Sequence, residues 1–327
     1  MYNMEGELTT LRNVGNTCYI NSIIQVLRHT KNMNEMLDEM SIDLLNNEKA
    51  IILREWNSLR QTMWKQRCVV SPYRFLHFVR EGKKTKELTN NFEQQDVGEF
   101  LIILLEEFHN GIKRNVSMNF TGEIKNKKDV LFMEMYKEYK KLYEKSYSEI
   151  IDIYYGMQET VISRLDTKQI LCRKIEPISI LNLAILDDQA KTIYDCMDEY
   201  CKSEVLCGDN KWENEKTGKK EEVSITTKII LAPKVLIISL KKYANEKQLI
   251  TFPLDDFNLT EYTNTKDDVH YELYGVCNHI GVQSFGHYDS YVRINDKWYC
   301  FNDTQVREIK ANNVVTRGAY CLFYRRI

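Results

Sequence analysis

The chain is poor in the residues that loosen a fold, and neither sign of charge is in large excess. Its 327 residues include only 4 prolines and 13 glycines, which argues against disordered tails and low-complexity linkers. Its 45 basic and 47 acidic residues give a net charge of -2, which does not indicate nucleic acid as a partner. No apolar run approaches the roughly 18 residues that span a bilayer. These absences predict a globular protein that binds neither nucleic acid nor membrane, and we expect a monomer.

Nine cysteines are present, and their odd number and irregular spacing do not suggest a disulfide framework. No secretory signal is recognisable, because residues 1–10 are polar and acidic. Reduced thiols are typical of intracellular proteins, so we expect the cytoplasm, the nucleus or both. The chain is long enough to bury a core without disulfides or metal. The cysteines stand at positions 18, 68, 172, 196, 201, 207, 277, 300 and 321.

Helical patterns dominate the first half of the chain, and strand-like runs dominate the second. Helices are predicted over 18–30, 46–66, 73–80, 93–110 and 125–151. Ser71 is expected as the N-cap of the third helix, with Pro72 at its first position. Strands are predicted at 160–162, 175–185, 223–231, 235–240, 271–277, 288–294, 297–302 and 319–325, with an exposed hairpin tip at 209–222. This segregation indicates an α+β fold without a linker that would divide the chain.

Cys18 stands directly after a Gly-Asn-Thr turn and directly before an apolar run of helical spacing. The pattern places it in the first turn of a helix, where backbone N–H groups and the macrodipole favour negative charge. A thiol at that point is expected to have a lowered pKa and to be a better nucleophile at neutral pH. One cysteine among nine could stand there by chance, so a cysteine enzyme also needs a base and a group that orients the base.

His287 is the best candidate base among six histidines. The histidines at 29, 77 and 109 fall in or at the ends of predicted helices, where a capping or partly exposed role is the simpler interpretation. Those at 270 and 279 flank a predicted strand and stay open as candidates. His287 follows Gly286, which allows close approach of another segment to the backbone. On spacing alone, His287 is preferred but not established.

Asn302 ends the next predicted strand, and Asp303 follows it. A strand, a turn near 295–296 and a second strand would bring residue 302 back beside His287. An amide or carboxylate there can accept the Nδ1–H of His287 and fix its tautomer. Side chains alternate along a strand, so at most one of the two should face the histidine. Without Cys18, an ordinary turn after a strand would be the preferred interpretation.

Three separated blocks, in one order, resemble the ubiquitin-specific proteases. The first surrounds Cys18, the second covers a predicted helix, and the third surrounds His287; all three together are very specific. The blocks are Leu11 to Ser22, Gln94 to Leu101 and Gly286 to Val306, with weaker similarities at Tyr155-Gly156 and 233–243. The resemblance implies a papain-like cysteine protease fold with fingers, palm and thumb. The thumb would span about 1–155, the fingers about 156–232 and the mainly antiparallel palm about 233–327.

Carried over position by position, the resemblance implies that Cys18 is the nucleophile and His287 its general base. Asn302 would orient the imidazole, and Asp303 would be an accessory polar group. Asn13 matches a position whose side-chain amide stabilises the oxyanion, although an ordinary turn asparagine would be the interpretation without the motif. Loss of one such donor costs about 2.7–4 kcal/mol in comparable hydrolases.

The resemblance also implies contacts to the ubiquitin tail, which ends Leu-Arg-Leu-Arg-Gly-Gly. An extended basic tail needs acidic partners, and Asp96 and Glu99 at i and i+3 would share one face of a helix. A solvated acidic turn is the simpler alternative. Gly286 suits a channel too narrow for side chains. The expected tail contacts are therefore Gln95, Asp96, Glu99, Gly286 and Tyr288.

Many members of this family carry a zinc site at the fingertips, but this sequence departs from the pattern of its ligands. Four thiolates in two Cys-x-x-Cys pairs would be strong evidence for zinc. The four aligned positions hold Cys172, Ile175, Asn214 and Thr217, so only one ligand remains. The other nearby cysteines, at 196, 201 and 207, are irregularly spaced. We therefore expect no metal and no cofactor.

The resemblance implies a thiol protease that hydrolyses the isopeptide or peptide bond after the C-terminal glycine of ubiquitin. Its partners would be ubiquitin and ubiquitinated proteins. Two alternatives stay open. One is a ubiquitin-binding scaffold of the same fold without activity, which the presence of every catalytic part makes the weaker. The other is a protease for another ubiquitin-like modifier, which the sequence hardly separates from the first.

Overall fold

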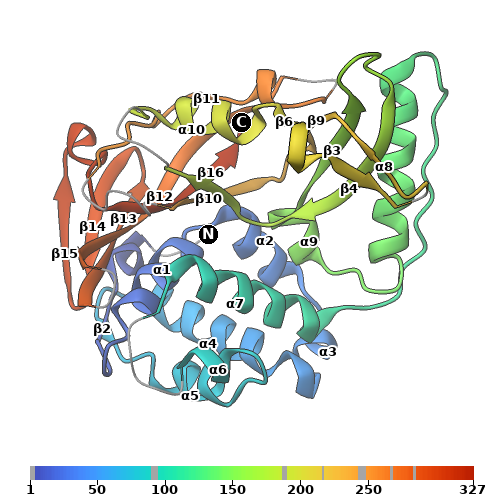
Figure 1. The fold of residues 1–327 in the computed structure, drawn as a ribbon. Helices are drawn as coiled ribbons and strands as arrows, with labels where there is room; N and C mark the ends of the chain where they lie inside the picture. The colour runs from blue at the N-terminus through green and yellow to red at the C-terminus, as the bar shows by residue number, and fades with distance from the viewer. Residues whose placement is uncertain are drawn as a thin grey trace.

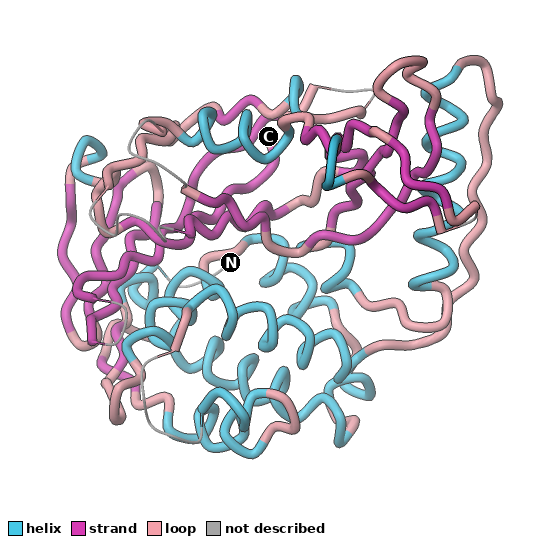
Figure 2. Tube along the Cα trace, viewed as in Figure 1, coloured by secondary structure: helices cyan, strands magenta, loops and turns pink. Residues whose placement is uncertain are grey.

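The computed structural model of this chain describes residues 4–89, 95–185, 190–215, 217–241, 248–265, 268–282 and 285–327. Helices from the first half of the chain form a layer against one face of a large sheet from the second half (Figure 1). A smaller sheet extends to one side, with helix α8 (Lys127–Tyr143) beside it (Figure 1 and Figure 2). The predicted α+β fold is therefore confirmed. Among the described residues, no helix is both long and apolar enough to cross a membrane.

The helical layer begins with α1, which carries Cys18 as its first residue. Every residue of α1 is buried, because the helix lies between the sheet and the other helices. The helices are α1 (Cys18–Arg28), α2 (Lys31–Glu39), α3 (Ile42–Leu45), α4 (Ile51–Lys65), α5 (Tyr73–Glu81), α6 (Thr85–Thr89), α7 (Val97–Ile112) and α9 (Glu149–Tyr154). One further helix, α10 (Ile193–Cys201), covers the opposite face of the sheet.

The large sheet has the order β15-β14-β13-β12-β16-β10-β5, with β11 paired to β12. Its pairs are antiparallel except for β10 with β5. Its strands are β5 (Leu181–Ala184), β10 (Val235–Lys241), β11 (Phe257–Asn258), β12 (His270–Val282), β13 (Phe285–Ile294), β14 (Lys297–Asn302), β15 (Gln305–Ile309) and β16 (Ala319–Arg326). The hairpin of β13 and β14 carries both His287 and Asn302.

The smaller sheet has four strands in the order β4-β3-β9-β6. These are β3 (Gly156–Arg164), β4 (Ile170–Ile178), β6 (Glu204–Leu206) and β9 (Val223–Leu231). The polar interval at 209–222 contains the hairpin of β7 (Trp212–Asn214) and β8 (Lys219–Glu221), as predicted. A short parallel pair, β1 (Thr10–Leu11) with β2 (Val69–Val70), ties the segment before Cys18 to the helical layer.

The large sheet is buried on both faces. Its strands therefore divide their apolar residues between two cores, since alternate side chains point to opposite faces. Ile237 belongs to the core shared with α1, α4 and α7, whereas Ile238 belongs to the core under α10. This explains why the sequence of β10 is a continuous apolar run. The site is thus carried by a sheet that is supported from both sides.

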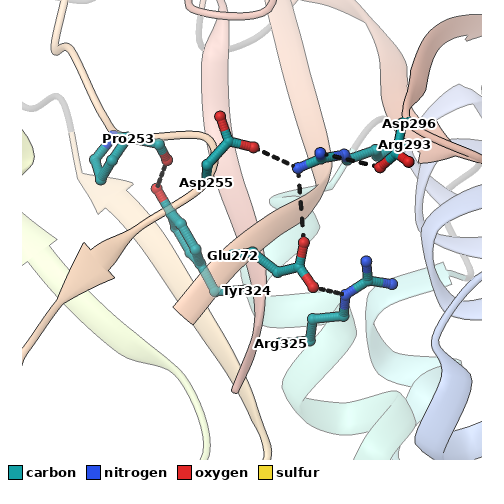
Figure 3. A network of polar contacts seen from close by, with 7 residues as sticks. All are labelled: Pro253, Asp255, Glu272, Arg293, Asp296, Tyr324 and Arg325. Atoms are coloured by element: carbon teal, nitrogen blue, oxygen red, sulfur yellow. Dashed lines mark hydrogen bonds and ion pairs between the residues drawn. The ribbon is translucent and has the colours of Figure 1, made fainter. Parts of the chain in front are cut away.

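An ion-pair network lies at the turn end of the hairpin that carries His287 (Figure 3). Arg293 on β13 contacts Asp255 at 2.7 Å, Asp296 at 3.1 Å and Glu272 on β12 at 3.6 Å. Glu272 also accepts from Arg325 on β16 at 2.6 Å. The network therefore links three neighbouring strands. The turn itself has positive φ at the Asn-Asp pair 295–296 (49° and 62°), a conformation that asparagine and aspartate tolerate.

Three predicted helix boundaries are wrong. The helix predicted over 93–110 begins at Val97, with Asp96 as its N-cap; residues 90–94 lie outside the described part of the chain. The N-cap before α5 is Pro72 and not Ser71. The helix predicted over 125–151 is two helices, α8 and α9. It is interrupted because the backbone of Tyr147 exchanges hydrogen bonds with that of Arg114, which requires an extended segment there.

Among the described residues, four helices, α2, α3, α6 and α10, were not predicted, nor were the strands β1, β2, β6, β11 and β15. For α10 a usable signal exists in the sequence. Thr192 accepts from the backbone N–H of Asp195, and Asp195 accepts from that of Thr192. This reciprocal pair is a capping box, which marks a helix start.

Candidate active site

Cys18 lies at the first position of α1, as predicted, and is 1% exposed. The turn before it is tight because Gly15 and Asn16 both have positive φ (86° and 52°). Three backbone N–H groups lie against the Cys18 sulfur: those of Cys18, Tyr19 and Tyr288. The contact with Tyr288 brings the thiol to the residue that follows His287.

The predicted lowering of the Cys18 pKa is wrong for the free protein. Burial raises the pKa of the Cys18 thiol, and the negative charge of Asp303 adds to that rise. The backbone N–H groups at the helix start act in the expected direction, since they lower the pKa. They are outweighed because the sulfur is withdrawn from water. Cys18 is therefore a protonated thiol at neutral pH unless a base accepts its proton.

His287 and Asn302 contact each other directly, as the spacing predicts. The distance from His287 Nε2 to Asn302 Oδ1 is 2.7 Å. Because an amide oxygen only accepts, Nε2 carries the proton and Nδ1 has the free lone pair. The nitrogen expected to contact the orienting residue was Nδ1, so that detail is wrong. The ring presents Nε2 to β14, which leaves Nδ1 to act as the base.

Asp303 does not face the histidine. Its φ of 47° turns the chain after β14, and its carboxylate accepts from Asn13 Nδ2 at 3.0 Å and from Asn21 Nδ2 at 2.8 Å. Its backbone oxygen accepts from the N–H of Leu11. Asp303 thus joins the end of β14 to the segment that precedes Cys18. Asn21, which is buried on α1, is a contact that the sequence analysis missed.

Asn13 folds back over the turn before Cys18. Its Oδ1 accepts from the backbone N–H of Thr17 at 3.2 Å and from the Thr17 hydroxyl at 3.3 Å. Its Nδ2 donates to Asp303, and the side chain is exposed. An amide nitrogen has two hydrogens, so one can serve Asp303 while the other is offered to an oxygen at the site. Asn13 is therefore held in place beside Cys18 by contacts on both ends of its amide.

The acidic groups expected to contact a basic tail lie at the start of α7, but they do not share a helix face. Asp96 is the N-cap and accepts from the backbone N–H of Glu99 at 2.9 Å. Its other oxygen accepts from Lys241 at 3.2 Å and from the Tyr320 hydroxyl. Burial favours a higher pKa for Asp96, but these hydrogen bonds and the Lys241 charge outweigh it and lower the pKa. The carboxylate is ionised and already has partners; the side chain of Glu99 is exposed and Gln95 is half-buried.

Aromatic rings from α1, β12 and β16 surround Tyr288 on β13. The Tyr288 ring lies 6.5 Å from that of Tyr19, 6.5 Å from that of Tyr320 and 4.6 Å from the His279 imidazole. A Cβ on Gly286 would lie 2.1 Å from His279 Nε2, so no side chain fits there without a shift. A side chain at this position would therefore have to displace the imidazole of His279, a neighbour on β12 that was not predicted to contact Gly286. Tyr320 and Lys241 were also missed as partners of Asp96.

The four positions aligned with the zinc ligands do not converge on a ligand set. Cys172 pairs with Ile162 within the smaller sheet, and Asn214 donates to Glu221 at 3.2 Å. Within the described ranges, no group of three or more histidine, cysteine, aspartate or glutamate side chains could hold a metal ion. None of the nine cysteines, all of which lie in those ranges, forms a disulfide.

Comparisons with known proteins agree on one family. Residues 9–324 match the family described as ubiquitin carboxyl-terminal hydrolase. Ubiquitin carboxyl-terminal hydrolase 2 of Bos taurus is 30% identical over 340 residues, which cover 97% of this chain and 55% of the bovine protein. Ubiquitin carboxyl-terminal hydrolase Usp2 of Drosophila melanogaster is 28% identical, over 98% of this chain and 35% of the fly protein. The chain therefore spans about a third to a half of the length of these relatives.

The fold is shared with solved structures. A chain of the SAGA DUB module bound to monoubiquitin superposes with a TM-score of 0.75 and covers 100% of this chain and 71% of its own length. Its sequence identity is 22%, so this likeness shows the fold alone. The family match extends from the segment before Cys18 to the last strand and includes His287 and Asn302. The chain belongs to the ubiquitin carboxyl-terminal hydrolase family.

Proposed function

We propose that this chain is a thiol-dependent deubiquitinase that hydrolyses the isopeptide or peptide bond after the C-terminal glycine of ubiquitin. One observation carries the proposal. His287 is hydrogen-bonded to Asn302 at 2.7 Å, and Tyr288, the residue after His287 on β13, directs its backbone N–H to the Cys18 sulfur. This arrangement in a member of the family supports the roles of Cys18 as nucleophile, His287 as base and Asn302 as the group that orients the base.

The proton steps follow from the tautomer of His287. Its Nδ1 accepts the proton of the Cys18 thiol, and Asn302 holds the resulting imidazolium through Nε2–H. The thiolate attacks the carbonyl carbon of the terminal glycine, and the developing oxyanion is stabilised by Asn13 and backbone N–H groups at the start of α1. The imidazolium then gives its proton to the leaving amine. Water hydrolyses the thioester, with His287 again as the base.

The start of α7 and strand β13 are the proposed walls of the tail channel. Asp96, Glu99 and Gln95 would face the basic residues of the tail, while Gly286 and Tyr288 would enclose its Gly-Gly end. Because Asp96 already binds Lys241 and Tyr320, a tail arginine would have to join or displace these partners. In this proposal the thumb is about 1–155, the fingers about 156–232 and the palm about 233–327, and the protein acts as a monomer in the cytoplasm, the nucleus or both.

The substrate proposal is tested by labelling with ubiquitin whose C-terminus carries a thiol-reactive electrophile. A parallel panel carries the same electrophile on other ubiquitin-like modifiers. We expect a covalent adduct at Cys18 with the ubiquitin probe and faster labelling by it than by the others. Preferred labelling by a different modifier would identify a protease for that modifier. Binding of ubiquitin without an adduct from any probe would instead support the scaffold alternative and contradict the proposal.

Asn302→Ala and Asp303→Ala should both lower activity, but through different partners. Loss of Asn302 leaves His287 without its orienting acceptor, and we expect kcat/KM to fall about 10²- to 10⁴-fold. Asp303 is held by Asn13 and Asn21, so we expect that it does not replace Asn302. Loss of Asp303 releases Asn13, and we expect kcat to fall about 10²- to 10³-fold, as for loss of an oxyanion donor. Hydrolysis of ubiquitin linked to a fluorogenic amine measures both.

A double-mutant cycle separates the two roles. Adding Asn13→Ala to Asp303→Ala should cost little more than either change alone, because both remove the same donor. Adding Asn13→Ala to Asn302→Ala should give close to the product of the two losses. The reverse pattern would show that Asp303 acts on His287 and that the assignment from geometry is wrong.

A further inference from the structure

A row of polar side chains crosses the end of the sheet behind the His287–Asn302 pair. Asn278 on β12 is paired in register with Asp289 on β13. The next register pair along β13 and β14 is Ser290 with Phe301, so Asp289 lies directly across from Asn302. Residues directly opposite in antiparallel strands have Cβ atoms about 4.5–5.5 Å apart. His287 is two residues from Asp289 on the same strand, so the two side chains share a face.

Asp289 is a buried carboxylate, with only 6% of the residue exposed. Its Oδ1 accepts from Asn278 Nδ2 at 2.8 Å, and its Oδ2 accepts from the Cys300 thiol at 3.8 Å. Asn278 is itself buried and is held by the Thr316 hydroxyl at 3.3 Å. These partners are neutral. A buried charge normally requires a partner of opposite sign, and the contacts above do not supply one.

The charges that act on the pKa of Asp289 are those of His287 and Arg307. Burial raises the pKa of the Asp289 carboxyl, whereas the Asn278 hydrogen bond and the charges of His287 and Arg307 oppose that rise. Arg307 stands on the exposed edge strand β15, where water screens it. His287 is half-buried, so its imidazolium is the countercharge of Asp289 that water weakens least. The titratable and charged groups around the carboxylate are His287 and Tyr291 on β13, Cys300 on β14, Arg307 on β15 and Cys277 on β12. The exposed Arg67 and the half-buried Cys68 beside β2 line the same cavity as Asp289.

We infer that Asp289 is a positioning residue for the catalytic base: its fixed negative charge stabilises the imidazolium that His287 forms when it takes the proton of Cys18. This inference rests on the proposed function, in which His287 is that base. No proton moves to Asp289. The thiol proton passes from Cys18 to His287 Nδ1 and later to the leaving amine, and the inference requires Asp289 to be ionised while it does so. Asn302 orients the ring, and Asp289 supplies the charge that a neutral amide lacks.

The test is the proton NMR titration of His287 in the full chain, in a Cys18→Ser background that removes the thiol from the titration. Asp289→Asn deletes the charge and keeps the size and hydrogen-bonding shape of the side chain. We expect the midpoint of the His287 titration to fall by about one pH unit, the lower end for loss of a nearby opposite charge. In the otherwise unchanged enzyme, the same substitution should lower kcat of ubiquitin hydrolysis about three- to tenfold and move the acid limb of its pH profile to lower pH.

Two further variants decide between this role and a structural one. Arg307→Gln removes the positive charge that competes for Asp289 and should move the His287 midpoint upward, which also tests the inference should Asp289→Asn fail to fold. Glu55→Gln removes another buried carboxylate, paired with Arg74 on the far side of the helical layer, and should leave the midpoint unchanged. An unchanged midpoint in folded Asp289→Asn, or a downward shift in Arg307→Gln, would overturn the inference. Because the NMR readout needs no ubiquitin, a shifted midpoint without hydrolysis would fault the proposed function alone.

Discussion

Cys18→Ser is expected to abolish the covalent adduct with electrophile-tipped ubiquitin and to lower turnover about 10⁴- to 10⁶-fold, the loss seen when a nucleophile is removed from other hydrolases. The side chain is buried at the start of α1, and its sulfur is approached by three backbone N–H groups. A serine hydroxyl fits the same space but is a much weaker acid than a thiol. Ubiquitin binding should persist, because Cys18 contributes almost no surface. Labelling and calorimetric binding measure the two properties separately.

Cys207→Ser is the matched control for that experiment. Cys207 is exposed and lies outside the large sheet and the helical layer that carry the site. Its thiol is the most accessible of the nine to a non-specific electrophile. Labelling that depends on accessibility alone would therefore be lost in the Cys207→Ser variant. We expect the adduct to form at the normal rate in Cys207→Ser. An adduct that persists in Cys18→Ser would place the nucleophile elsewhere and contradict the assignment.

The His287–Asn302 contact could be predicted because its geometry is local. Strand β14 has the predicted bounds, Lys297 to Asn302, because a short apolar and aromatic run, Trp298 to Phe301, lies between two turns. A tight hairpin fixes its register with β13, so the distance in sequence between His287 and Asn302 was sufficient to place them together. Cys18 was placed at a helix start by equally local signals, a glycine-containing turn and an apolar run.

What could not be predicted depends on contacts between distant segments. Whether Asp303 supports His287 or Asn13 depends on its positive φ, and nothing in the strand pattern requires that conformation. The pKa of Cys18 depends on how far the packed sheet withdraws its sulfur from water. Asp96 became an N-cap with partners on β10 and β16, which are more than 140 residues away in sequence. Asp289 was overlooked because its neighbours are defined by register and not by a motif.

His287→Ala should also end catalysis, with a loss of about 10⁴- to 10⁶-fold in kcat. Its second expected effect is on the thiol itself. Burial raises the pKa of Cys18 above its ordinary value, so without a base the thiol stays protonated through neutral pH. Alkylation of Cys18 by iodoacetamide, followed on its peptide by mass spectrometry, should therefore be slow at pH 7 and keep rising with pH beyond the range of an ordinary cysteine.

The alkylation experiment distinguishes two ways of activating the thiol. In the enzyme with His287 present, proton transfer to Nδ1 should allow alkylation at neutral pH. His270→Ala is the matched control, because His270 lies at the other end of β12 and binds Asp256; it should alkylate like the unchanged chain. If His287→Ala alkylated as fast at pH 7 as the control, the backbone N–H groups at the start of α1 would be sufficient to generate the thiolate. The helix start would then be the activating element, and the role of His287 would be confined to protonating the leaving amine.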